Sequence, residues 1–220
     1  MTMNSGVTGQ SIADVAYTKY RLMPYDLVLG LISGALWGCP AGRVVDFYNE
    51  HVSGNHLDVG IGTGYFLDHC CFPVARPRLV LMDSNPDPLE HASQRLARYE
   101  PIKLQANVLQ PISYDGERFD SVGLNHVVHC LPGTMHEKGR AFGHLRALMK
   151  DGAPLFGATV LGQGVKHNAL GALWLERFNA KGVLDNARDD REGLEAALRE
   201  HFSSASVRVV GRTALFHARA

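Results

Sequence analysis

From about residue 56 onward, short apolar runs alternate with longer stretches that carry apolar residues at helical spacing. The short runs predict buried strands and the longer stretches predict amphipathic helices. Five strands are expected, at 56–59, 79–83, 102–106, 119–124 and 153–160, with helices between them at 64–72, 86–99 and 136–149. Strands that alternate with helices form a parallel sheet with helices on both faces, so the pattern predicts a doubly wound α/β fold.

The two ends of the chain depart from this alternation. A mostly helical insert is expected at 165–202, and two strand-like runs at 206–210 and 213–218 predict a hairpin around Gly211. Before the first strand, helices are expected within 11–37, with a break at Pro24, and again at 43–51. We therefore predict an N-terminal helical cap at 1–50 and a compact domain at 51–220.

Composition excludes several classes of protein. The chain is 45% hydrophobic and 20% charged, which suffices for a full core. Lys plus Arg equals Asp plus Glu at 22 each, so the basic surface typical of nucleic-acid binding is not expected. The longest apolar run, 27–37, is shorter than the ~20 residues of a membrane span.

The start of the chain and the cysteines bear on compartment and metal content. Residues 1–10 are polar, so we expect no secretory leader. The four cysteines show neither a CxxC motif nor the spacing of a zinc site, so no metal is expected. Reduced cysteines within a core predict a cytoplasmic protein.

A glycine-rich loop follows the first predicted strand. The run from Asp58 to Gly64 carries glycine at 60, 62 and 64 and leads directly into a helix. Such a loop lets a ligand approach the backbone closely. The nicotinamide dinucleotide fingerprint would place its third glycine where Tyr65 stands, which disfavours a dehydrogenase. Asp83 ends the second strand about 20 residues later, where a doubly wound nucleotide site places the acid that binds a ribose.

Together, the glycine loop and Asp83 resemble the motifs of class I S-adenosylmethionine-dependent methyltransferases. The resemblance covers about 50–160 well. It implies a Rossmann-like, mostly parallel sheet of about seven strands, in which the C-terminal hairpin adds an antiparallel strand. It also implies that S-adenosyl-L-methionine is the cofactor and that the N-terminal helices cover the substrate side.

The resemblance assigns cofactor contacts to residues at the strand ends. Backbone amides of Gly60, Gly62 and Gly64 would hold the methionine carboxylate, and Asp58 would orient the loop or meet the amino group. Asp83 would accept from both ribose hydroxyls. The remaining candidates, at the adenine and at the sulfonium, are Ser84, Asn107, Val108 and Asn125. Asn107 stands where the family commonly has Asp, and a simple turn role is the alternative.

Two histidines follow the fourth strand, where the family passes beside the transferred methyl group. His126 and His129 are three residues apart and would share a face if this stretch were helical. Either could act as the general base. The alternatives are a substrate-shaping role for His126 and a core position for His129.

The candidates for substrate binding lie in the N-terminal helices and the insert. They are Tyr17, Tyr20, Tyr25, His167 and Trp174, with ordinary helix packing as the alternative for the aromatic residues. The sequence thus predicts methyl transfer to a small, partly apolar metabolite through an O-, N- or C-nucleophile, by a chain that could form a homodimer. The alternatives are other chemistry with the same cofactor, or a non-catalytic partner subunit.

Overall fold

A seven-stranded sheet organises the part of the protein that the structure describes. The structure, a computed structural model, describes residues 33–220. The strand order is β3-β2-β1-β4-β5-β7-β6, in which β7 runs antiparallel to β5 and β6. The strands are β1 (Asn55–Val59), β2 (Arg78–Asp83), β3 (Ile102–Gln105), β4 (Ser121–Asn125), β5 (Pro154–Val160), β6 (Ser204–Val210) and β7 (Thr213–Arg219). The predicted doubly wound fold with a C-terminal antiparallel hairpin is confirmed.

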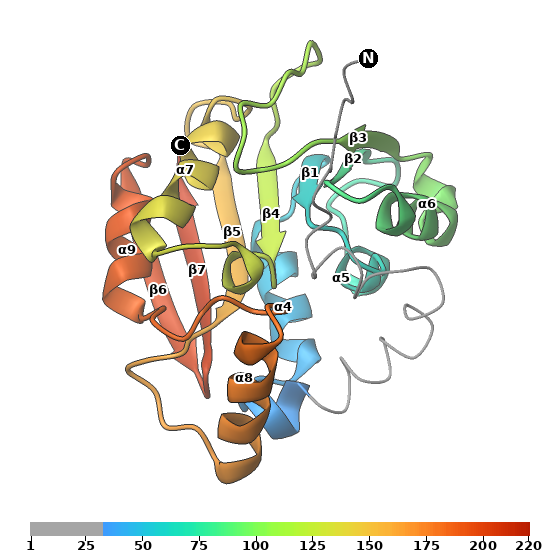
Figure 1. The fold of residues 1–220 in the computed structure, drawn as a ribbon. Helices are drawn as coiled ribbons and strands as arrows, with labels where there is room; N and C mark the ends of the chain where they lie inside the picture. Colours follow the sequence, from blue (N-terminus) through green and yellow to red (C-terminus); the bar gives the residue numbers. More distant parts are fainter. Residues whose placement is uncertain (1–32) are drawn as a thin grey trace, which may run out of the picture.

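Helices cover both faces of this sheet (Figure 1). The helices are α4 (Ala41–His51), α5 (Tyr65–His69), α6 (Pro86–Arg95), α7 (Met135–Arg146), α8 (Ala169–Ala180) and α9 (Arg191–Arg199), with short 3₁₀ turns η1 (Ala97–Tyr99) and η2 (Val128–Cys130). Buried side chains of α4, α5 and α6 form one core with the sheet, and those of α7 and α9 form a second core with the opposite face. Both faces of the central strands are therefore shielded from water.

Local sequence signals set the starts of these helices. Asn85 caps α6, because its side chain accepts the amide N–H of Asp87 at 3.0 Å. Thr134 and Glu137 form a reciprocal capping box at the start of α7. Asn168 and Asp190 cap α8 and α9, and each side chain accepts the amide N–H of the residue three positions later. These contacts satisfy amide groups that the helices themselves leave unpaired.

Several predicted elements differ in extent. The helix expected at 86–99 ends at Arg95 and is followed by the 3₁₀ turn η1. The helix expected at 64–72 is shorter, because Cys70 turns the backbone into an extended conformation. The fourth strand begins at Ser121, since Phe119 forms only an isolated bridge to Met149. The insert contains two helices, α8 and α9, joined by an irregular segment at 181–190.

The expected N-terminal cap is described only from residue 33 onward. Its last helix, α4, packs on the sheet through Val44, Phe47 and Tyr48. Tyr17, Tyr20 and Tyr25 lie outside the described residues. Within 33–220, no helix has the length and apolar character needed to cross a membrane. The same part of the chain contains no cluster of three or more His, Cys, Asp or Glu side chains suited to a metal ion.

Candidate active site

A cavity of about 380 Å³ lies beyond the carboxyl ends of the parallel strands, a volume within the usual range for small-molecule sites. Its walls come from the loops that follow β1, β2, β3 and β4. The lining residues are Tyr48, 58–67, 82–85, 106–109, 125–127 and 130–132. The structure therefore brings together all nine residues predicted to bind the cofactor.

The glycine loop forms one wall of the cavity. Gly60, Gly62 and Gly64 all have positive φ, at 66°, 54° and 74°, which glycine adopts without steric cost. A Cβ on Gly60 would lie 2.2 Å from the side chain of Val127, whereas a Cβ on Gly62 would meet nothing within 4 Å. Gly60 is thus required by packing, and Gly62 leaves open space beside the backbone.

Two amides of this loop are engaged within the fold. The N–H of Gly60 donates to Met82 at 2.8 Å, and that of Gly64 donates to Ile61 at 3.0 Å. These bonds tie the loop to β2 and close its turn. Any backbone N–H groups of this loop that bind a ligand are therefore those of residues 61–63, which lie between Gly60 and Gly64.

Asp83 and Asn107 are held by local hydrogen bonds at the ends of neighbouring strands. Asp83 Oδ1 accepts the amide N–H of Asn85 at 3.0 Å, which orients the carboxylate at the end of β2. Asn107 Oδ1 accepts the amide N–H of Leu109 at 2.9 Å, so Asn107 does form the turn considered as its alternative role. Since an amide oxygen has two lone pairs, this turn is compatible with a second contact to a ligand.

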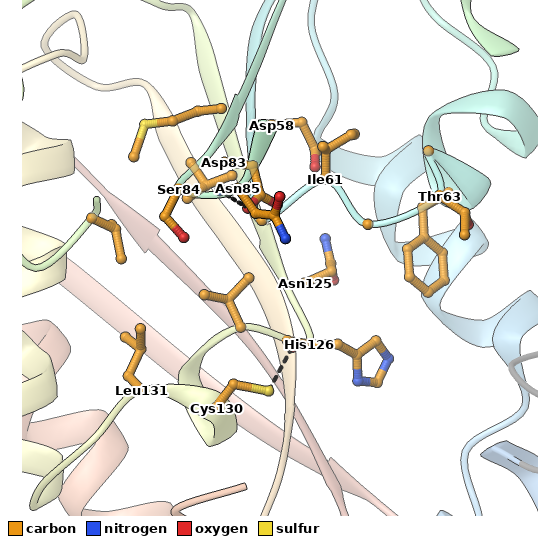
Figure 2. Close-up of a pocket in the computed structure, with 18 of the residues that line it drawn as sticks. Asp58, Ile61, Thr63, Asp83, Ser84, Asn85, Asn125, His126, Cys130 and Leu131 are labelled. Atoms are coloured by element: carbon orange, nitrogen blue, oxygen red, sulfur yellow. Dashed lines mark hydrogen bonds between the residues drawn. The ribbon is translucent and has the colours of Figure 1, made fainter. Parts of the chain in front are cut away.

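Asn125 places a buried amide group in the cavity wall. Its side chain is only 6% exposed, yet neither Oδ1 nor Nδ2 has a partner at hydrogen-bond geometry among the described residues. The amide does lie near the Tyr48 hydroxyl, whose pKa it lowers against the stronger effect of burial, which raises that pKa. Figure 2 shows the Asn125 side chain between the glycine loop and the His126 segment. Because buried polar groups are nearly always paired, this amide indicates a polar ligand group in the cavity.

The two predicted histidines occupy different environments. His126 lines the cavity, stacks on Phe66 with ring centroids 5.7 Å apart, and has a φ of 58°, which is unusual for a residue with a side chain. Burial lowers the pKa of His126 to about 4, so its ring is neutral at pH 7. Because His126 precedes the 3₁₀ turn η2, the two histidines do not share a helix face.

His129 is directed into the sheet and is absent from the cavity wall. Its Nδ1 accepts the amide N–H of Val160 at 3.1 Å and lies 3.2 Å from Thr159 Oγ1. The proton of a neutral ring must then sit on Nε2. Burial, together with His126 and Lys138, lowers the pKa of His129 well below its usual value. This geometry favours the alternative of a core histidine.

The substrate residues predicted in the insert lie away from the cavity. Neither His167 nor Trp174 lines it, and Trp174 is 37% exposed and contacts Phe178 on α8. Both assignments depend on what the residues before Ser33 contribute to the site. They remain predictions from the sequence.

Tyr48 and Cys130 line the cavity but were not among the predicted site residues. Tyr48 lies on α4, ahead of the glycine loop, and its hydroxyl donates to Asp58 Oδ2. In the sequence, Tyr48 is marked only by its place in the apolar helical pattern at 43–51, and that pattern indicates packing rather than a binding site. Cys130 was predicted as a core residue, and burial raises the pKa of its thiol to about 12.

Comparison with known proteins identifies the family. The sequence model of the methyltransferase domain matches residues 57–155. Demethylluteothin O-methyltransferase of Streptomyces thioluteus is 37% identical over 92% of this chain and 91% of its own length. The physcion biosynthesis cluster O-methyltransferase of Aspergillus chevalieri is 36% identical over 92% of each chain.

A solved structure shows the same fold. The N-methyltransferase NodS of Bradyrhizobium japonicum, in complex with S-adenosyl-L-homocysteine, superposes with a TM-score of 0.53 at 19% identity, over 91% of this chain and 84% of that one. The same family is indicated by the glycine loop, by the acid at the end of β2 and by the two curated relatives. The chain belongs to the family of class I S-adenosylmethionine-dependent methyltransferases.

Proposed function

We propose that this protein transfers the methyl group of S-adenosyl-L-methionine to a hydroxyl group of a small, partly apolar metabolite. The two curated relatives named above are O-methyltransferases, one of them from a biosynthesis cluster, which supports this acceptor atom and a role in secondary metabolism. The observation that carries the proposal is the buried amide of Asn125, which has no partner at hydrogen-bond geometry among residues 33–220 and lies in a cavity that Asp83 and the glycine loop also line.

The residues present fit the cofactor. Asp83 supplies acceptor oxygens for a ribose diol, and Asn107 and Ser84 stand beside it for the adenine. Gly62 leaves the backbone accessible to the amino-acid portion, and Asp58 offers a carboxylate to an ammonium group. The cofactor would supply a methyl group made electrophilic by the attached sulfonium.

The protein itself contributes alignment and exclusion of water. Positioning of two reactants can lower a barrier by ~7–11 kcal/mol, which is a large share of what a methyl transfer requires. His126 lies on the wall that follows β4, and its neutral ring can accept a hydrogen bond from an acceptor hydroxyl; the burial that lowers its pKa to about 4 also makes it a weaker general base. His129 holds η2 against β5 and thereby fixes the segment that carries His126.

The acceptor part of the cavity is mainly apolar. Cys130, Leu131 and Pro132 form its wall, and Figure 2 shows Cys130 next to the backbone of His126, with Leu131 beyond it. Because burial raises the pKa of Cys130 to about 12, its thiol is neutral and does not compete for the methyl group. Such a wall favours a small, partly apolar acceptor over a polymer.

The helices expected before residue 33 would complete the acceptor side of this cavity. Tyr17, Tyr20 and Tyr25 on these helices would be pocket residues. A homodimeric state and a cytoplasmic location are separate parts of the proposal. Limited proteolysis with and without S-adenosylhomocysteine tests the helical cap, since a cap that closes the site should become protected from cleavage when the ligand binds.

Titration calorimetry with S-adenosylhomocysteine tests the cofactor assignment. Wild-type protein should bind it, and Asp83→Asn should weaken binding by about tenfold or more, because one buried ribose donor loses its acceptor. Asp115→Asn, an exposed carboxamide substitution outside the cavity, is the matched control and should bind as wild type does. Failure of the wild-type protein to bind S-adenosylhomocysteine would refute the proposal.

Mass spectrometry of candidate acceptors tests the reaction. Incubation with S-adenosylmethionine should add one CH₂ unit to a hydroxylated aromatic compound, and not to the same compound with its hydroxyl group removed. Transfer of another part of the cofactor would give a different mass and would indicate the alternative chemistry. A binding subunit would change no acceptor at all.

A further inference from the structure

A chain of buried polar side chains runs from the interior of the sheet to the cavity. His56 Nδ1 lies 2.7 Å from Ser121 Oγ, and His56 Nε2 lies 3.3 Å from Asp58 Oδ2. The hydroxyl of Tyr48 donates to the same Asp58 oxygen. The network of Tyr48, Asp58, His56 and Ser121 thus joins helix α4 to strands β1 and β4.

All four members of this network are removed from water. His56 and Ser121 have no exposed surface, and Tyr48 and Asp58 are 1% and 3% exposed. A polar group at such a position is costly unless it is hydrogen-bonded. The pairing is therefore a requirement of the fold, but pairing alone does not explain why two donors meet at one carboxylate oxygen.

The hydrogen bonds converge on Oδ2 of Asp58. Because a carboxylate oxygen only accepts, the Nε2 of His56 carries a proton that is directed at Oδ2, while Nδ1 faces the Ser121 hydroxyl. The Tyr48 hydroxyl approaches that same oxygen from α4. Two donors thus hold the carboxylate through Oδ2. Among residues 33–220 the side-chain hydrogen bonds of Asp58 all go to Oδ2, so Oδ1 can meet a ligand in the cavity that Asp58 lines.

Strand β4 leaves room for this arrangement. Gly123 pairs with Asp58 across the sheet, and a Cβ at Gly123 would lie 2.8 Å from Asp58 Oδ2 and 3.1 Å from His56 Nε2. Because β-strand conformation does not itself need glycine, Gly123 is explained by the space that the network occupies.

We propose that His56 and Tyr48 are positioning residues, which hold the Asp58 carboxylate in the orientation that receives the amino group of the methyl donor's methionine portion. The inference rests on the proposed function, since it presumes that the cavity binds this cofactor. Both act through Asp58: His56 lies behind the cavity wall, and Tyr48 is part of that wall. Ser121 contributes by contacting the other ring nitrogen, Nδ1, which fixes the orientation of the His56 ring.

Two ligands separate this role from a general structural one. S-Adenosylhomocysteine carries the amino-acid portion, whereas 5′-methylthioadenosine keeps the adenosyl group and lacks the amino and carboxylate groups. A variant that misplaces only the Asp58 carboxylate should weaken binding of the first ligand alone. A variant that damages the whole cavity should weaken both.

Two substitutions at His56 form a matched pair. His56→Gln places an amide N–H near the position of Nε2 and should keep the affinity for S-adenosylhomocysteine within about threefold. His56→Asn reaches only the position of Nδ1, so it keeps the contact with Ser121 and loses that with Asp58. We expect about tenfold weaker binding of S-adenosylhomocysteine by His56→Asn and unchanged binding of 5′-methylthioadenosine.

Tyr48→Phe is a second, independent variant that removes one hydroxyl and keeps the ring. It should show the same selective loss, of about tenfold, in calorimetry at pH 7.5. Equal loss for both ligands, or wild-type affinity for S-adenosylhomocysteine in both His56→Asn and Tyr48→Phe, would overturn the inference while leaving the proposed function intact. Absence of binding by the wild-type protein would instead overturn the proposed function.

Discussion

Replacing Asn125 by leucine should stabilise the protein and weaken its binding of the cofactor. The two side chains have the same branched shape, and Asn125 lies at the carboxyl end of β4 with both polar side-chain atoms unpaired at hydrogen-bond geometry among residues 33–220. Leucine removes these polar atoms from a position that is 6% exposed. The substitution therefore separates the effect of Asn125 on stability from its effect on cofactor binding.

The magnitude follows from the burial of that amide. An unsatisfied buried polar group costs about 1–3 kcal/mol, and water reaching the cavity would offset part of this. We expect Asn125→Leu to raise the free energy of unfolding by about 1–2 kcal/mol. For a protein of this size, 1 kcal/mol shifts the melting temperature by about 2–4 °C. The affinity for S-adenosylhomocysteine should fall by about tenfold or more, since a polar group of the ligand then loses its partner.

Urea unfolding and calorimetry on the same preparations measure both effects. Asn107→Leu is a useful control, because Asn107 is exposed and already bonded to Leu109, so its replacement should bring no gain in stability. The reasoning would be refuted if Asn125→Leu lowered the free energy of unfolding and left the affinity for S-adenosylhomocysteine unchanged. That result would mean that the amide serves the fold alone.

Three further predictions concern the loop, a buried ion pair and acid stability. Gly60→Ala should lower the free energy of unfolding by about 2–4 kcal/mol in urea titrations, because its Cβ would lie 2.2 Å from a neighbouring methyl group and its φ is 66°. Gly62→Ala has the strained φ without the clash, so it should lower the free energy of unfolding by only about 1 kcal/mol. Equal losses of stability in Gly60→Ala and Gly62→Ala would contradict the packing argument. Lys138→Met should lower the free energy of unfolding by about 3–5 kcal/mol, because it leaves the carboxylate of Asp189, 2.6 Å from the amine in the wild type, buried without its cation. Adding Asp189→Asn should recover part of that loss, and no recovery would show that the charge is not the cause. Burial lowers the pKa of His126 from 6.5 to about 4, so the unfolded chain binds more protons in this range and stability should fall as the pH drops from about 6.5 to about 4. His126→Phe should flatten this part of the profile of melting temperature against pH, and an unchanged slope would exclude a contribution from this ring.

The cofactor side of the site could be predicted from the sequence because its signals are local. Gly60, Gly62 and Gly64 are required by a backbone path within one strand–helix turn, and Asp83 ends the next strand. In a parallel sheet the carboxyl ends of the strands lie at one edge, so residues that directly follow the strands in the sequence are expected to be neighbours in the fold. Asn125 and Asn107 were found by the same rule.

The network behind Asp58 could not be predicted in this way. Tyr48 belongs to a helix whose apolar spacing indicates only packing, and His56 lies inside a strand. Ser121 reaches them from β4, which is far away in the chain. Such contacts depend on how α4 and β4 lie against β1, and periodicity carries no information about that placement.

The histidines show a different limit of sequence analysis. Their spacing of three residues would place them together on a helix, but His126 adopts a positive φ before the 3₁₀ turn and its ring remains at the cavity. His129 then follows within that turn and reaches Val160 and Thr159 of β5. One backbone angle that the sequence does not reveal decides which of the two faces the site.

Gly123 has a consequence for how homologues diverge. Since it lies opposite Asp58 and leaves no room for a methyl group beside either Asp58 or His56, a larger residue at 123 can become established only in lineages where the acid or the imidazole has already been replaced. The size of a single residue in this strand should therefore covary with the pair at 56 and 58 across the descent of these enzymes. A homologue that has alanine there while retaining both partners would be the exception that an alignment could reveal.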